Sequence, residues 1–192
     1  LETNPEFHRF VFIDKDVESL NALREQVEAN FPKKLFRVQF MEGDANERLE
    51  EITNWNWNTR RAVVFLDPFA LHVKWSTIQR IAKTRSMDMW LLFPAMAVNR
   101  MMPRSGVIPP DWASKLTEVF GSADWESVFF EKSPRDMFGE EQIRKNSTAF
   151  FERLSKFVTS RLEDEFFGVH DEPLILKSSK GIPLFLFCFA AG

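Results

Sequence analysis

The chain has 192 residues, of which 44% are hydrophobic and 28% charged, a composition typical of one globular domain. Its formal net charge of −3 excludes a domain with an overall basic excess, so any contact with nucleic acid would need a local patch. The chain has a single cysteine, Cys188, which excludes an internal disulfide framework. No apolar run approaches the roughly 18 residues that a membrane span needs. The first residues lack the pattern of a signal peptide. We therefore expect a cytoplasmic protein that makes no membrane contact.

The first half of the chain alternates strand-like and helix-like patterns. Strands are predicted at residues 9–14, 35–41, 62–67 and 87–94, and helices at residues 16–31, 45–53 and 75–84. Short connections between alternating elements are typical of a parallel sheet with helices on both faces.

The second half has a different pattern. Residues 99–112 contain three prolines and predict a long loop, residues 139–167 predict one amphipathic helix, and residues 173–191 predict two strands around a Ser-Ser-Lys-Gly turn. An α/β series that closes with an antiparallel β-hairpin favours a Rossmann-like class I methyltransferase fold. We expect one such domain over residues 1–192.

Three successive predicted strands are followed by an aspartate, where ligands bind in open α/β sheets. Asp14 follows the first strand and is placed to accept both hydroxyls of a ribose. Asp16, two residues further along, is a second candidate to bind the cofactor. The alternative is that Asp14 and Asp16 only cap the next helix, for which Asp16 is a reasonable N-cap.

Asp44 and Ala45 follow the second strand and Gly43. A carboxylate and backbone amides at this point can read the amino edge of an adenine. The alternative is a capping box, since Glu47 stands three residues after Asp44.

The third strand ends in Asp67, Pro68 and Phe69. A carboxylate beside a proline carbonyl offers two acceptors to an exocyclic amine, and the aromatic ring can stack on a base. Such a site would catalyse by positioning the nitrogen toward a methyl donor. The alternative is an ordinary turn at the end of a strand.

Basic residues follow the fourth strand, and either line a substrate rim or form a solvated face. They are Arg100, Arg104, Arg135, Arg144 and Lys145, of which Arg100 and Arg104 are the candidates for the rim. The three histidines, at positions 8, 72 and 170, are dispersed and lack the spacing of a zinc site, so no metal is expected.

Five segments together resemble the three-Cys-motif partner (TcmP) proteins, over nearly the whole chain. They are "FVFIDKD", "EGDANE", "VVFLDPFA", "MDMWLLFPAMAVNRM" and "KGIPLFLFCFAA". The resemblance implies an S-adenosylmethionine-dependent methyltransferase fold, with Asp14 at the ribose, Asp44 at the adenine, and Asp67, Pro68 and Phe69 at the acceptor. It also implies a three-cysteine, radical-enzyme-like protein as partner.

Two features depart from the family pattern. The family's first strand and glycine loop, which resemble "DxFAGPG", are absent, and we expect them upstream of Leu1. The "DPF" motif also differs from the "DPPY" of amino-directed nucleic-acid methyltransferases. Three functions therefore stay open: a methyltransferase acting on a nucleic acid base, a catalytically inactive binding partner with the same fold, and an NAD-linked oxidoreductase.

Overall fold

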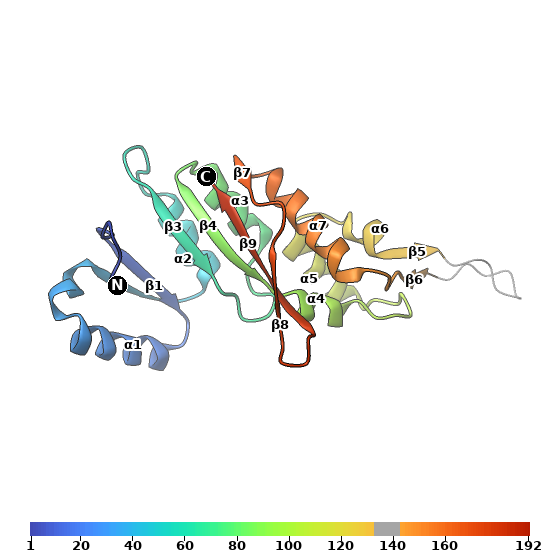
Figure 1. Cartoon of the computed structure of the whole chain (residues 1–192), viewed down its shortest axis with the longest axis horizontal. Helices are drawn as coiled ribbons and strands as arrows, with labels where there is room; N and C mark the ends of the chain where they lie inside the picture. Colours follow the sequence, from blue (N-terminus) through green and yellow to red (C-terminus); the bar gives the residue numbers. More distant parts are fainter. Residues whose placement is uncertain (133–142) are drawn as a thin grey trace, which may run out of the picture. The chain divides into compact units, whose positions relative to one another are not determined.

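The computed structural model describes residues 1–132 and 143–192. The chain divides into two compact units, Leu1–Trp55 and Asn56–Gly192. It is a mixed α/β structure with a central multi-stranded sheet and a C-terminal antiparallel hairpin (Figure 1). The expectation of one domain over residues 1–192 stays a prediction.

The first unit is a β-α-β arrangement with a second helix after it. Its elements are β1 (Phe10–Asp14), α1 (Val17–Asn30), the 3-10 helix η1 (Pro32–Arg37), β2 (Val38–Glu42) and α2 (Ala45–Thr53). β1 and β2 pair in parallel, with Phe10 opposite Val38 and Asp14 opposite Glu42. The parallel pairing brings the carboxyl ends of both strands to the same edge.

The strand predicted at residues 35–41 begins later, at Val38, and the earlier residues belong to η1. Pro32 stands in the first turn of η1, where its fixed φ suits a helical start and its missing N–H costs nothing. The Lys34 N–H donates to the Phe31 carbonyl at 2.8 Å. The strand prediction is therefore wrong at residues 35–37, where the apolar alternation belongs to a helical turn.

The second unit contains a five-stranded sheet. Its strands are β3 (Ala62–Leu66), β4 (Met87–Phe93), β7 (Gly168–Val169), β8 (Leu174–Lys177) and β9 (Pro183–Ala191). The order is β3-β4-β9-β7, and β8 also pairs with β9. Only β3 and β4 run parallel, and β9 is antiparallel to each of its partners. The β8–β9 hairpin is confirmed, but the sheet is mixed rather than mostly parallel, because β9 returns beside β4.

The remaining described elements of this unit are mostly helical. They are α3 (Trp75–Lys83), α4 (Ala95–Met101), α5 (Pro110–Phe120), α6 (Trp125–Phe129), β5 (Phe130–Lys132), β6 (Ile143–Lys145) and α7 (Phe150–Glu163).

Two sequence predictions are wrong in this region. The loop expected at 99–112 is shorter, because α4 continues to Met101 and α5 starts at Pro110, a residue that fits the first helical turn. The helix expected at 139–167 starts only at Phe150, since residues 143–145 pair with β5 and the Asn146 side chain accepts the Thr148 N–H at 3.1 Å. Residues 139–142 of that prediction lie outside the described residues.

One face of the second unit's sheet is covered by helices. Alternate residues of β4, from Met87 to Phe93, are fully buried. Phe93 stacks on Phe120 of α5 at 5.8 Å between ring centroids, and Phe120 meets Phe157 of α7 edge-on at 5.1 Å. Burial of these aromatic rings holds α5 and α7 onto the sheet.

The opposite face is aromatic and partly exposed. Val63 and Phe65 of β3 are 50% and 58% exposed, and Trp90 of β4 is 37% exposed. Trp90 stacks on Phe187 at 4.8 Å and contacts Phe189 at 4.7 Å. Within this unit, the described helices therefore cover the sheet on one face.

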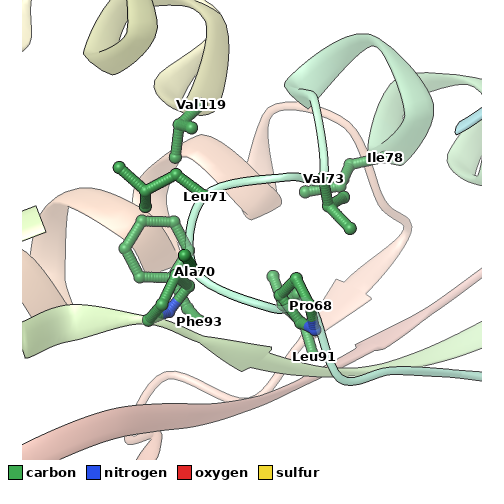
Figure 2. Close-up of a pocket in the computed structure, with 9 residues that line it drawn as sticks. Pro68, Ala70, Leu71, Val73, Ile78, Leu91, Phe93 and Val119 are labelled. Atoms are coloured by element: carbon green, nitrogen blue, oxygen red, sulfur yellow. The ribbon is translucent and has the colours of Figure 1, made fainter. Parts of the chain in front are cut away.

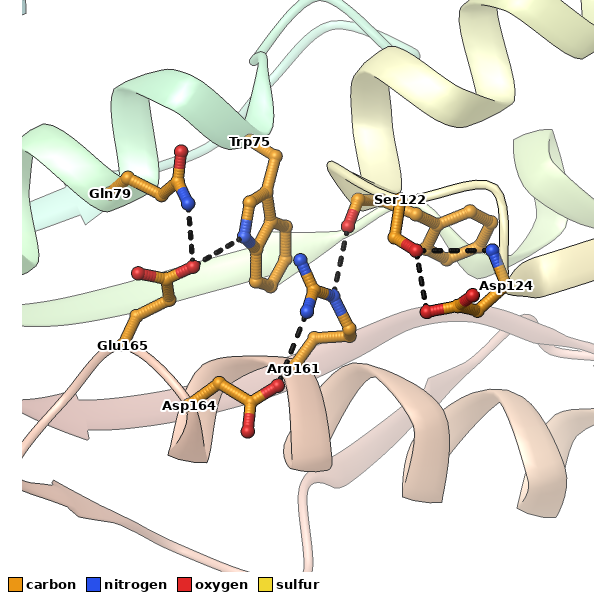
Figure 3. A network of polar contacts seen from close by, with 8 residues as sticks. Trp75, Gln79, Ser122, Asp124, Arg161, Asp164 and Glu165 are labelled. Atoms are coloured by element: carbon orange, nitrogen blue, oxygen red, sulfur yellow. Dashed lines mark hydrogen bonds and ion pairs between the residues drawn. The ribbon is translucent and has the colours of Figure 1, made fainter.

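A polar network joins α3, the end of α5 and α7 (Figure 3). The Trp75 indole N–H and the Gln79 amide both donate to Glu165 Oε1, at 3.2 and 2.7 Å. Arg161 donates to the Phe120 carbonyl at 3.2 Å and lies over the Trp75 ring at 5.2 Å. These contacts hold α3, the end of α5 and α7 together around Trp75, which is buried.

Candidate functional site

The tips of β1 and β2 hold the residues predicted to bind a cofactor. Asp14 is the last residue of β1, and its carbonyl accepts the Gly43 N–H at 3.0 Å, which ties the two strand ends together. Its side chain is exposed and accepts the Asp16 N–H at 2.9 Å. The sequence therefore placed Asp14 correctly at a strand tip.

Asp16 is the N-cap of α1, as one of its two interpretations predicted. Its carboxylate accepts the Glu18 N–H at 3.1 Å and the Ser19 hydroxyl at 2.7 Å. The Ser19 hydroxyl, with the Glu18 amide, lowers the pKa of this carboxyl. The side chain has a structural task that explains its presence.

Asp44 has a similar task at the start of α2. It is the N-cap, and its Oδ1 accepts the Asn46 N–H at 2.8 Å and the Asn46 side-chain amide at 2.9 Å. The Asn46 side chain is the largest cause of the lowered pKa of Asp44. Ala45 follows as the first helical residue. Capping is therefore the observed role of Asp44.

Gly43, which precedes this cap, has a conformation that the sequence did not reveal. Its φ is 138°, and a Cβ placed there would lie 2.8 Å from Arg48 Nε. The Arg48 Nε in turn donates to the Glu42 carbonyl at 2.7 Å. Gly43 lets the chain turn sharply from β2 into α2 while Arg48 closes over the turn.

Asp67, Pro68 and Phe69 directly follow β3 and point in different directions. Asp67 is exposed, and Phe69 is 81% exposed beside the His72 ring, 5.7 Å away between centroids. Pro68 is buried. Ala70 has a positive φ of 52°, a conformation that costs a non-glycine residue about 1 kcal/mol. The turn thus exposes Asp67 and Phe69, the two side chains predicted to contact the methyl acceptor.

Pro68 faces an apolar space beneath the turn (Figure 2). The space has a volume of about 10 Å³ and lies among Pro68, Leu71, Leu91, Phe93 and Val119. That volume is near the lower limit for one water molecule, and apolar walls give a water no partners. The space is a small packing gap under the turn, and no substrate fits inside it.

Arg100 and Arg104 line a much larger cavity of about 630 Å³. Its walls come from the end of α4, the segment after it, and the start of α7. The lining residues are Asn99, Arg100, Met102, Pro103, Arg104, Lys145, Ser147, Ala149, Phe150, Phe151 and Glu152.

Lys145 joins these walls. Its ammonium donates to the Asn99 carbonyl at 3.2 Å, to Asn99 Oδ1 at 2.6 Å and to the Met102 carbonyl at 3.0 Å. It also lies 4.0 Å from the centroid of the Phe150 ring. Burial, with a smaller effect from the Arg104 charge, lowers the pKa of Lys145 to about 8.

The structure thus groups the predicted residues by unit. Asp14, Asp16, Asp44 and Ala45 lie together at the strand tips of the first unit, whereas Asp67–Phe69 and the two arginines belong to the second. Arg135, another of the basic residues that follow the fourth predicted strand, lies outside the described residues. Sequence reasoning missed Asn99, Phe150 and Phe151, because no local pattern links residues 99–104 with 145–152.

Over residues 1–132 and 143–192, no helix combines the length and the apolar character that a membrane span requires. No family model matches this chain, and a search of curated protein sequences finds no significant match.

Proposed function

We propose that this chain is an S-adenosylmethionine-dependent methyltransferase with a Rossmann-like class I fold, acting on a nucleic acid base. The alternating strands and helices, the antiparallel strand beside β4 and the resemblance to three-Cys-motif partner proteins support this proposal. A fold alone does not establish a reaction, so the proposal depends on the residues at the strand tips.

The observation that carries the proposal is the exposed Asp14 carboxylate at the end of a strand, beside the start of α2. An acid in that place suits the two hydroxyls of a ribose. Asp44 holds the first turn of α2, and the Ala45 amide at that turn is the proposed donor to the adenine ring. In this proposal Asp44 orients the turn rather than contacting adenine through its own carboxylate.

Calorimetric titration of the full-length protein with S-adenosylmethionine and, separately, with NAD tests this assignment. We expect heat with S-adenosylmethionine, and affinity reduced by about tenfold or more in Asp14→Asn, because a charged hydrogen-bond acceptor is lost. Glu25→Gln is the matched control, since Glu25 is an exposed carboxylate within α1 of the same unit. Heat with NAD alone would instead identify a nicotinamide-linked oxidoreductase.

A second experiment addresses the acceptor. Asp67, the Pro68 carbonyl and Phe69 are the proposed contacts to an exocyclic amine. A labelled-methyl assay on DNA, RNA and protein pools should show transfer to nucleic acid by the wild type, and its loss in Asp67→Ala with cofactor binding retained. Asp171→Ala, which removes an 85% exposed carboxylate of the same unit, should transfer normally. Transfer by Asp67→Ala at the wild-type rate would remove Asp67 from the reaction.

Two observations favour a second candidate, a binding partner of a three-cysteine radical-type protein without turnover. The space under the Asp67 turn holds only about 10 Å³, and Asp16 and Asp44 serve as helix caps. A protein that binds S-adenosylmethionine but transfers no methyl group to any pool would support this candidate over the enzyme.

A further inference from the structure

The cavity beside Arg100 and Arg104 has the size and lining of a small-ligand site. Its volume of about 630 Å³ falls within the roughly 300–1,000 Å³ typical of such sites. All of its lining residues belong to the second unit, and they come from two stretches about 50 positions apart in the sequence. We call it the α4–α7 cavity.

Its charge is opposite to that of the protein as a whole. The net charge of the chain is −3, yet the cavity lining contains three cationic side chains, Arg100, Arg104 and Lys145, and one carboxylate, Glu152. Both arginines are exposed, and within residues 1–132 and 143–192 neither guanidinium forms an ion pair with a carboxylate. Among the described residues, positive charge therefore gathers at this cavity, where the two guanidinium groups are exposed.

Lys145 and the arginines have different tasks in this arrangement. The Lys145 ammonium donates its hydrogen bonds to Asn99 and Met102, so it contributes charge and fixes the wall. A guanidinium is planar and donates two parallel hydrogen bonds, which suits a phosphate. The Arg104 charge also disfavours the protonated form of Lys145, a repulsion that a bound anion would relieve.

The rest of the lining is mixed: Asn99 and Ser147 are polar, and the other residues are apolar. Met102 and Phe150 are buried and Phe151 is half-buried, with the two phenylalanine rings edge-on at 5.3 Å. Phe151 is therefore the lining aromatic with ring surface open to a ligand, and its place near the guanidinium groups suits a ligand that has a flat base at one end and a phosphate at the other. A simple acidic peptide would use the arginines but leave the Phe151 ring without a partner.

We propose that the α4–α7 cavity binds one nucleotide unit of a single-stranded nucleic acid, with Arg100 and Arg104 on its phosphate and Phe151 beside its base. This inference deepens the proposed function, because it names a contact to the nucleic acid acceptor. Binding itself needs no methyl donor, and it is therefore measurable independently of methyl transfer.

Fluorescence anisotropy of a short labelled single-stranded oligonucleotide, without S-adenosylmethionine, tests the proposal on the full-length protein. Arg100→Gln and Arg104→Gln should each weaken binding by about tenfold to a hundredfold, since each removes a charged hydrogen-bonding partner. Each should also reduce the slope of log K against log salt by about 0.7, the value for one phosphate contact on a single strand. Arg60→Gln removes an exposed arginine of the same unit and should change neither quantity.

Further variants separate a specific site from general attraction. Arg100→Lys keeps the charge but loses the planar fork, so its affinity should fall between wild type and Arg100→Gln. Phe151→Leu should weaken oligonucleotide binding while leaving the salt slope unchanged. Circular dichroism and the urea midpoint confirm that each variant is folded.

Apart from a wild type that binds no oligonucleotide, three results would overturn the proposal. The first is an equal loss in Arg60→Gln, the second is unchanged affinity in both cavity variants, and the third is competition by a polyglutamate peptide as strong as that by unlabelled oligonucleotide. If the cavity variants lose oligonucleotide binding but the wild type gives no heat with S-adenosylmethionine, the nucleotide site stands and the methyltransferase assignment fails. If the wild type gives heat with S-adenosylmethionine but binds no oligonucleotide, the cofactor assignment stands and the nucleotide site fails.

Discussion

Replacing Gly121 by alanine tests the close approach between the end of α5 and Trp75. Gly121 is the C-cap of α5 with a φ of 67°, and a Cβ there would lie 2.3 Å from Trp75 Cδ1 and 2.4 Å from Cγ. Trp75 is 1% exposed and is held by Glu165 and Arg161, so its ring has little freedom to move away. The added methyl group therefore meets a rigid, buried neighbour.

Gly181→Ala is the matched control, because it separates backbone strain from the clash. Gly181 has a φ of 75°, yet nothing lies within 4 Å of a Cβ placed there. Alanine in the left-handed conformation costs about 1 kcal/mol at either glycine. Overpacking against Trp75 adds about 1–3 kcal/mol, so Gly121→Ala should lower the free energy of unfolding by about 2–4 kcal/mol.

Urea unfolding followed by tryptophan fluorescence and by far-ultraviolet circular dichroism measures both variants. A cost of about 2–4 kcal/mol corresponds to a fall in Tm of about 4–16 °C for a chain of this size. Equal costs for Gly121→Ala and Gly181→Ala, within about 0.5 kcal/mol, would refute the reasoning. Such a result would mean that the Trp75 indole does not pack directly against the backbone at Gly121.

Three further predictions concern side chains with distinct environments. The Cys188 thiol is 1% exposed and burial raises its pKa to about 12, so iodoacetamide at pH 8 should leave it unlabelled in the native protein and label it after unfolding, as mass spectrometry will show. Asp44→Ala removes a helix cap and should lower the free energy of unfolding by about 1 kcal/mol in urea. Asp67→Ala should change it by no more than about 0.5 kcal/mol, because no described residue bonds to that carboxylate. A larger loss in Asp67→Ala would show that the carboxylate stabilises the turn. Lys115 and Lys74 lower the pKa of Glu118 below its ordinary 4.5. The ionised carboxylate therefore adds about 0–1 kcal/mol to the free energy of unfolding above pH 4.5, and this stabilisation is lost as pH falls through the lowered pKa. The difference in unfolding free energy between wild type and Glu118→Gln should therefore vanish at low pH, and a difference that persists at pH 2 would contradict the ion-pair assignment.

Local patterns predicted the elements whose signals are strongest. The strand at 62–67, the helix at 75–84, the strand at 87–94 and the terminal hairpin all appear within one or two residues of the expected bounds. Each combines a clear period with a turn or cap at its end. The loop predicted at residues 99–112 was too long, because its prolines indicated a loop whereas Pro110 begins α5.

The candidate site was predictable only in part. Asp14, Asp16 and Asp44 were singled out because each lies at the end of a strand or within two residues of it, and the helix-cap alternatives for Asp16 and Asp44 were visible in the same residues. The α4–α7 cavity could not be found in this way. Arg100 and Phe150 line the same cavity although they lie about 50 positions apart in the sequence, which is a property of the tertiary fold.

The β3 strand has a consequence for how copies of this protein behave together. Among the described strands of the second unit, β3 stands at the end of the hydrogen-bonded sheet, and its Val63 and Phe65 side chains are half exposed. An apolar, β-branched edge of this kind is a template for strand pairing between molecules, and such association rises with concentration. Arg60 and Arg61, directly before the strand, are charges of the gatekeeper kind that oppose it. Among the described residues, we therefore expect substitutions from Arg60 to Leu66 to change association between copies while leaving the core as it is.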